Sequence, residues 1–281
     1  MAIVGLSLLG ASPLTDLEVP ALRRLPDVAE ARSLLPAVTS AASIPTRQPG
    51  YQLVTNAGDV LPFGSAPVGS APAPLATGVA GVAWTGDGGG HWLATRDGGV
   101  FTFGDAAFHG SAGGAQLRSP IAGIASTRTG KGYWLVAADG GVFSFGDAKF
   151  YGSAARAHLR APIVGIAPTI DGAGYWLASA DGGVFTFGDA GFHGSATGSK
   201  LRGPIIGIAA TRTGRGYWLA AAEGGVFTFG DAAYRGGVAG TKLLSPIVGI
   251  ATTRSGKGYW LAAADGGVFS FGDAPFVGSS G

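Results

Sequence analysis

The feature that most constrains this chain is a tryptophan that recurs at a fixed interval of 42 residues, at Trp92, Trp134, Trp176, Trp218 and Trp260. Each lies in a Gly-aromatic-Trp-Leu motif, which reads Gly90-His91-Trp92-Leu93 in the first of these copies and Gly-Tyr-Trp-Leu in the other four. A degenerate copy, Gly50-Tyr51-Gln52-Leu53, lies 40 residues earlier. Six copies at a near-constant period predict a repeat architecture in which each unit packs on its neighbours.

Each repeat contains four short apolar runs, as residues 162–194 illustrate. The runs span residues 162–167, 175–180 and 184–187, and a short fourth run lies around Phe192-His193-Gly194. Aromatic and β-branched residues bounded by Gly, Asp or Pro predict strands. The Asp-Gly pair between the second and third runs predicts a hairpin with a type I′ turn. Helical periodicity is absent from the repeats, so an all-β fold is expected.

Four antiparallel strands per repeat, repeated six times, predict a six-bladed β-propeller with a 42-residue repeat and four-stranded blades. The first run of five units carries a glycine, at Gly81, Gly123, Gly165, Gly207 and Gly249, as expected for strands that meet in a tight centre. The Trp and Phe residues lie in the second and third runs, where blades have more room. An open solenoid is the alternative. It would need a polar capping unit, whereas the chain ends directly after a regular sixth unit, so closure is expected.

The first 49 residues differ from the repeats at 50–281 and are expected to form an irregular or partly helical arm. Residues 38–45 stand where the first strand of the degenerate unit belongs. Residues 3–7 are an alternative closing strand, because Ile3-Val4-Gly5-Leu6-Ser7 is similar to the first run of a regular unit. Between them, Pro26 and Asp27 begin a candidate short helix over residues 26–35.

Composition excludes several classes of protein. With 46% hydrophobic and 13% charged residues among 281, the chain can bury a core and is not generally disordered. Nineteen Lys and Arg against seventeen Asp and Glu leave a net charge of +2, so no nucleic-acid partner is expected. The absence of Cys excludes disulfides, thiolate metal sites and Cys nucleophiles. No apolar run reaches the roughly 18 residues of a membrane span, and residues 2–9 match a signal peptide poorly because no Lys or Arg precedes them.

Acidic residues recur at two turns of each repeat. One set is Asp97, Asp139, Asp181, Glu223 and Asp265, and the other is Asp105, Asp147, Asp189, Asp231 and Asp273. The two turns lie at opposite ends of one strand, about 16 Å apart at roughly 3.3 Å per residue. Paired glycosidase carboxylates need about 5–9.5 Å. The expected role is capping of the turns, and a cation-binding ring is the alternative. The sequence predicts no catalytic, cofactor-binding or metal-binding residue.

Candidate contacts with a partner or glycan come from two other sets. One position varies while its surroundings stay constant, and it holds His109, Tyr151, His193 and Arg235. The connections to the next first strand carry Arg118, Arg160 and Arg202. A variable position on a constant scaffold suits a contact surface, although an unconstrained outer-strand residue would look the same. The Trp rings are expected to pack between blades and not to stack on sugars.

The motifs Gly-Tyr-Trp-Leu, Asp-Gly-Gly-Val-Phe and Phe-Gly-Asp-Ala resemble the repeat arrays of actinobacterial secreted and cell-envelope proteins. The resemblance covers residues 50–281 and implies an extracellular or cell-envelope location. The resemblance also implies that the repeats have no assigned activity of their own. Similarity to the propeller repeats of the regulator of chromosome condensation is more distant, and no exchange-factor role is inferred from it.

These observations predict a non-catalytic binding or structural module, without a cofactor, that mediates protein–protein interaction in an actinobacterial envelope or extracellular assembly. A lectin-like module that binds cell-wall glycan through several weak sites is the alternative. A glycosidase-type hydrolase is a third hypothesis for the function. It requires carboxylates that converge in the centre, and the inner strands contain almost none.

Overall fold

Six consecutive three-stranded antiparallel sheets make up the computed structural model, which describes residues 38–43, 50–64, 75 and 77–281. We call the sheets with their loops units 1–6, in chain order. The first strands are β1 (Val38–Ser43), β4 (Val79–Trp84), β7 (Ile121–Ser126), β10 (Ile163–Pro168), β13 (Ile205–Ala210) and β16 (Ile247–Thr252). The second strands are β2 (Gly50–Thr55), β5 (Gly90–Thr95), β8 (Gly132–Ala137), β11 (Gly174–Ser179), β14 (Gly216–Ala221) and β17 (Gly258–Ala263). The third strands are β3 (Val60–Gly64), β6 (Val100–Gly104), β9 (Val142–Gly146), β12 (Val184–Gly188), β15 (Val226–Gly230) and β18 (Val268–Gly272).

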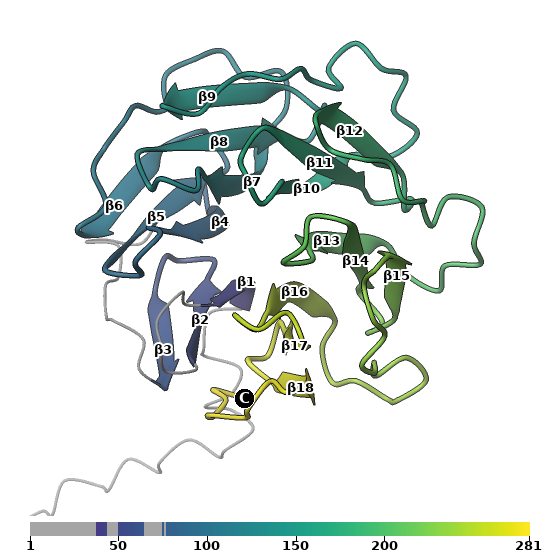
Figure 1. The fold of residues 1–281 in the computed structure, drawn as a ribbon. Coiled ribbons are helices and arrows are strands. Elements are labelled where there is room, and N and C mark those ends of the chain that lie inside the picture. Colours follow the sequence, from purple (N-terminus) through teal and green to yellow (C-terminus); the bar gives the residue numbers. More distant parts are fainter. Residues whose placement is uncertain (1–37, 44–49, 65–74, 76) are drawn as a thin grey trace, which may run out of the picture. The chain divides into compact units, whose positions relative to one another are not determined.

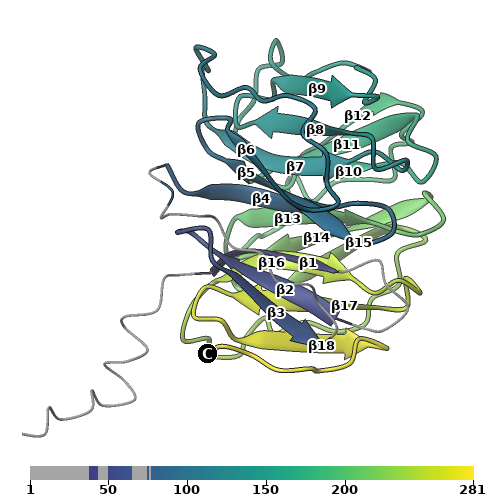
Figure 2. The same cartoon turned by 90° about the vertical axis from the view of Figure 1, so that its left-hand side faces the viewer.

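The described residues belong to one compact body, residues 35–281, and within it the first strands face one another (Figure 1). Each of β4, β7, β10 and β13 lies beside the first strand of the next unit, and β1 lies beside both β4 and β16. The third strands lie farthest from this inner group, so the order within each sheet runs from inside to outside (Figure 1), and in the turned view β9 and β18 lie at opposite edges (Figure 2). The all-β prediction and the repeat are confirmed.

The second strand of every unit is buried along its whole length, because neighbouring units cover both of its faces. Alternate side chains of a strand point to opposite faces, so the Trp of one unit meets the Tyr of the next. The ring centroids of Trp176 and Tyr217 are 5.7 Å apart. Unit 6 contacts unit 1 in the same way, with Trp260 and Tyr51 at 5.3 Å. The predicted packing of the Trp rings between units is therefore confirmed.

The first strands approach one another closely, as their glycines suggested. A Cβ added at Gly165 would lie 3.4 Å from Cγ2 of Ile208 in the next unit. In every unit the pairing with the second strand shifts by one residue just before or at this position, between Ile163 and Gly165 in unit 4. Such a β-bulge bends the strand and redirects a side chain.

The structure differs from two predictions about the loops of each unit. The turn after the second strand is not type I′, because the only residues with positive φ among those described are glycines. The N–H of Gly98 instead donates to Thr95 O at 2.9 Å, and Gly98 then adopts φ 89°, which gives a type I turn followed by a left-handed glycine.

The predicted fourth strand is also absent from units 2–6 in the described structure, where each sheet has three strands. A glycine in this segment, such as Gly194 with φ 128°, interrupts the extended backbone that a strand requires. In unit 1 the first-strand position is taken by β1, which pairs with β2. The candidate closing strand at residues 3–7 and the candidate helix at 26–35 lie outside the described residues.

Candidate functional site

One aromatic side chain in each of units 2–6 is exposed, although the Trp rings nearby are buried. These residues, which we call the aromatic array, are Phe108, Phe150, Phe192, Tyr234 and Phe276, with exposed fractions of 59, 60, 61, 62 and 61%. They lie in the segment after the third strand, at the 42-residue period of the chain. A single exposed aromatic needs no explanation, but the same exposure recurs at the same position in five units, which makes the array a candidate contact surface.

Hydrogen bonds hold the backbone on both sides of each array residue. At Phe192, the indole Nε1 of Trp176 donates to Gly191 O at 2.7 Å. The N–H of His193 donates to the hydroxyl of Tyr217 at 3.3 Å, and that hydroxyl donates to Gly194 O. Because Trp176 belongs to unit 4 and Tyr217 to unit 5, the array residue lies at the junction of two units.

The same arrangement recurs at the other array residues. The four remaining indoles donate to the residue before the array position, from Trp92, Trp134, Trp218 and Trp260 at 2.8, 2.7, 2.9 and 2.8 Å. At Phe276 in unit 6 the phenol comes from unit 1, because the Tyr51 hydroxyl donates to Gly278 O. Burial raises the pKa of these phenols, including that of Tyr217, above its ordinary value. The phenols are therefore neutral donors at physiological pH.

The predicted contact residues His109, Tyr151, His193 and Arg235 each directly follow an array residue. The backbone N–H of each of these residues donates a hydrogen bond to a Tyr hydroxyl of the next unit. The His193 ring lies 5.8 Å from the Tyr217 ring of the next unit, and the Tyr151 hydroxyl donates to Gly172 O at 2.9 Å. Three of the four are half-buried, and only Arg235 is exposed. The array residue next to each of the three half-buried residues presents more surface.

The predicted contacts Arg118, Arg160 and Arg202 are exposed in the connections to the next first strand. They lie ten positions in the chain after the array residue of their own unit. The array residues themselves were not among the predicted contacts. Its signal was an aromatic residue 16 positions after each Trp, but the aromatic type suggested core and not surface.

The four Asp residues of the first acidic set cap their turns, as predicted, whereas Oε2 of Glu223 is buried without a hydrogen-bond partner. Oδ1 of Asp181 accepts hydrogen bonds from the Ser179 hydroxyl at 2.6 Å and from the Gly183 N–H at 3.2 Å. In unit 2, the hydroxyl of Thr95 and the N–H of Gly99 hold the pKa of Asp97 below its ordinary value. In the second set, Asp147, Asp231 and Asp273 each accept from a Thr hydroxyl at 2.8 Å. No group of three or more His, Cys, Asp or Glu suited to a metal ion occurs in the described part of the chain.

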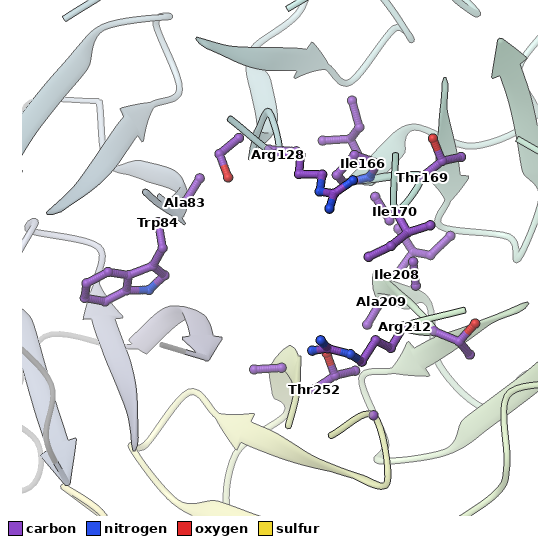
Figure 3. A pocket seen from close by; sticks show the side chains of 18 of the residues that line it. Ala83, Trp84, Arg128, Ile166, Thr169, Ile170, Ile208, Ala209, Arg212 and Thr252 are labelled. Carbon is purple, nitrogen blue, oxygen red and sulfur yellow. The ribbon is translucent and has the colours of Figure 1, made fainter. Parts of the chain in front are cut away.

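Two cavities lie between the first strands. The arginine cavity, of about 550 Å³, is lined by Arg128, Arg212 and Arg254, and Figure 3 shows the first two of these side chains. The proline cavity, of about 640 Å³, is lined by Pro120, Pro162 and Pro204 and by the side chains at the β-bulges. Val82, Ile166, Ile208 and Ile250 line both cavities and form an aliphatic collar where they meet.

No protein-family model matches the chain, and no curated protein matches it. The described part of the chain contains no helix with the length and apolar character needed to cross a bilayer.

Proposed function

We propose that the six sheets are the blades of a closed β-propeller, with the segment after each third strand as a fourth outer element. The contacts between the last and first units support this proposal. Tyr51 packs on Trp260 and donates its hydroxyl to Gly278 O, as Tyr217 does with Trp176 and Gly194 O. The strands β1 and β16 are also neighbours. Closure by the first unit would leave no terminal sheet in need of a polar cap.

We further propose that the propeller is a non-catalytic module that binds a protein partner in an actinobacterial cell-envelope or extracellular assembly. The aromatic array carries this proposal. Aromatic residues, Phe included, are enriched at the cores of protein interfaces, where they contribute a large contact area. The two backbone anchors beside each array residue reduce the entropy that binding would otherwise cost. Five equivalent positions suit a repetitive or extended partner.

The same array favours glycan binding as a second candidate function, because an exposed aromatic ring can stack on the apolar face of a sugar. A protein partner is preferred because the side chain that directly follows the array residue differs between units, with His109, Tyr151 and Arg235 as examples. Repeated recognition of one sugar would require the same polar groups at each site to fix its hydroxyls. The location in an envelope or extracellular assembly follows from the resemblance of the repeats alone.

A pull-down from actinobacterial cell-envelope and culture fractions tests the proposal. The test variant replaces all five array residues by Ser. The control replaces Ile170 and Leu244 by Ser, since these are exposed apolar residues outside the array at 51 and 80% exposure. We expect the wild type and the control to capture the same protein, and the array variant to lose it.

The alternative outcomes are equally specific. Capture that survives in the array variant, or no capture by the wild type, contradicts the proposal. Saturable binding to purified cell-wall polysaccharide that disappears in the array variant supports the lectin instead. Turnover of a polysaccharide that a single Asp substitution abolishes would identify an enzyme.

A further inference from the structure

The side chains that line the proline cavity are almost entirely aliphatic. Among the described residues, its lining consists of Gly, Ala, Val, Ile and Pro together with Arg96. No acidic, aromatic or hydroxyl-bearing side chain of the described residues lines it, so a ligand there would meet methyl groups and backbone. The volume of about 640 Å³ lies within the range of small-molecule sites, roughly 300–1,000 Å³.

The side chains at the β-bulges give this cavity an uneven wall. In units 2 and 3 the bulge position holds Ala80 and Ala122, whereas in units 4, 5 and 6 it holds Val164, Ile206 and Val248. All five residues line the cavity and are half-buried. The two Ala side chains therefore leave room beside units 2 and 3 that the larger side chains of the other three units fill.

Packing between neighbouring units holds these walls in place. Ala80 packs on the core between units 2 and 3, and Ile206 packs on the core between units 5 and 6. In the aliphatic collar, Ile166 and Ile208 are buried. The cavity is therefore formed without a ligand, which lowers the entropy that binding would otherwise cost.

Arg96 is the only charged residue among the described residues of the lining. It is exposed, and units 3 and 4 carry Ala138 and Ala180 at the same position of the wall. Transfer of an ionised group or of several hydroxyls from water to an apolar site is unfavourable unless polar partners replace the water. Because the aliphatic walls offer no such side chains, they favour an uncharged ligand with few hydroxyl groups.

We propose that the proline cavity binds an uncharged, compact aliphatic molecule of the alicyclic alcohol class. The carbon skeleton would lie against the aliphatic collar and fill the room beside Ala80 and Ala122. Affinity would come from the release of water from the aliphatic side chains, in proportion to the apolar area that binding buries. This site does not involve the aromatic array, so the two proposals can fail separately.

Titration calorimetry of the full chain with 1-adamantanol tests this proposal. We expect saturable binding of one molecule per chain. Cyclohexanol, which has a smaller skeleton, and 1-adamantanecarboxylate, which has the same skeleton and a negative charge, should each bind at least tenfold more weakly. Methyl glucoside, which is polar, should show no saturable binding.

Matched variants separate a site in this cavity from general adsorption to the protein. The test variant combines Ala80→Ile and Ala122→Ile, which give units 2 and 3 the residue that unit 5 carries as Ile206. The control combines Ser126→Ile and Ala210→Ile, at positions that line the arginine cavity but not the proline cavity. We expect the test variant to weaken 1-adamantanol binding at least tenfold, because the added carbons occupy the space of the ligand, and the control to change it less than twofold.

A second control, Arg96→Ala, removes the charge and gives unit 2 the residue of units 3 and 4 at this position. It should change 1-adamantanol binding less than twofold. Circular dichroism of each variant verifies that the fold is retained. If the two Ile substitutions unfold the chain, Ala80→Val with Ala122→Val takes their place, since Val164 and Val248 occupy the same position in units 4 and 6.

Four results would overturn the proposal. They are no saturable binding of 1-adamantanol, undiminished binding by the test variant, an equal loss in the control with Ser126→Ile and Ala210→Ile, and binding of the carboxylate as tight as that of the alcohol. A tenfold loss of 1-adamantanol binding in Arg96→Ala would likewise contradict recognition by the aliphatic walls.

Discussion

Removing the Tyr51 side chain tests whether the first and last units are joined. Tyr51 is 1% exposed, packs 5.3 Å from Trp260 and donates its hydroxyl to Gly278 O. Tyr217 is its internal counterpart, with 0% exposure, a separation of 5.7 Å from Trp176 and a hydroxyl bound to Gly194 O. Truncating a buried aromatic to Ala costs about 3–5 kcal/mol.

In a closed array, both Tyr51→Ala and Tyr217→Ala should lower the free energy of unfolding by about 3–5 kcal/mol, because every unit then has two packed neighbours. The assay is urea unfolding followed by tryptophan fluorescence. In an open array, unit 1 would fray on its own, and Tyr51→Ala would leave the main transition unchanged.

The matched control is Phe276→Ala, which removes an aromatic that is 61% exposed in unit 6. It should change stability by no more than about 0.5 kcal/mol. A transition midpoint for Tyr51→Ala that equals the wild type, beside a large loss for Tyr217→Ala, would refute closure through these contacts.

Three further predictions concern the repeated turns and phenols. Gly188 has φ 68° and an added Cβ would lie 2.2 Å from Ala173 O, whereas Gly198 has φ 85° with nothing within 4 Å. Gly188→Ala should therefore lower thermal stability clearly more than Gly198→Ala, which should cost about 1–2 kcal/mol from backbone strain alone; equal losses would contradict the steric argument. Burial raises the pKa of Tyr133, Tyr175, Tyr217 and Tyr259, so their neutral forms contribute stability below the unfolded pKa of about 10 that is lost as pH rises through the folded values. Urea midpoints should fall from neutral to alkaline pH over the range in which phenolate absorbance rises, and Tyr217→Phe should flatten the dependence. At the acidic end, the lowered pKa of Asp97 implies stability that is present above its ordinary pKa and lost as pH falls, and Asp97→Asn should reduce that loss in the same assay.

Much of the fold was predictable because the same patterns of strand and turn residues recur in each repeat. A Trp and a Tyr adjacent in a strand point to opposite faces, so their recurrence requires a neighbour on each side of the strand. Burial of Trp176 and Tyr175 confirms that reasoning. The first-strand glycines likewise predicted close approach, which Gly165 and Ile208 exhibit. The prediction of a fourth strand was wrong because the segment around Gly194 was interpreted as an extended apolar run, whereas Gly194 adopts a positive φ.

The sequence by itself determined the first three strands of each unit, their repetition and their antiparallel pairing, because alternation and turn residues act over a few positions. Only the tertiary structure decided which side chains reach the surface. Phe192 and Phe187 are alike in sequence, but Phe187 is half-buried while Phe192 is exposed between two backbone anchors. The arginine cavity also required the fold, since Arg128, Arg212 and Arg254 are separated by 84 and 42 residues and meet only where first strands converge. Exposure and convergence depend on how units pack on one another, and that long-range geometry is not encoded in any single repeat.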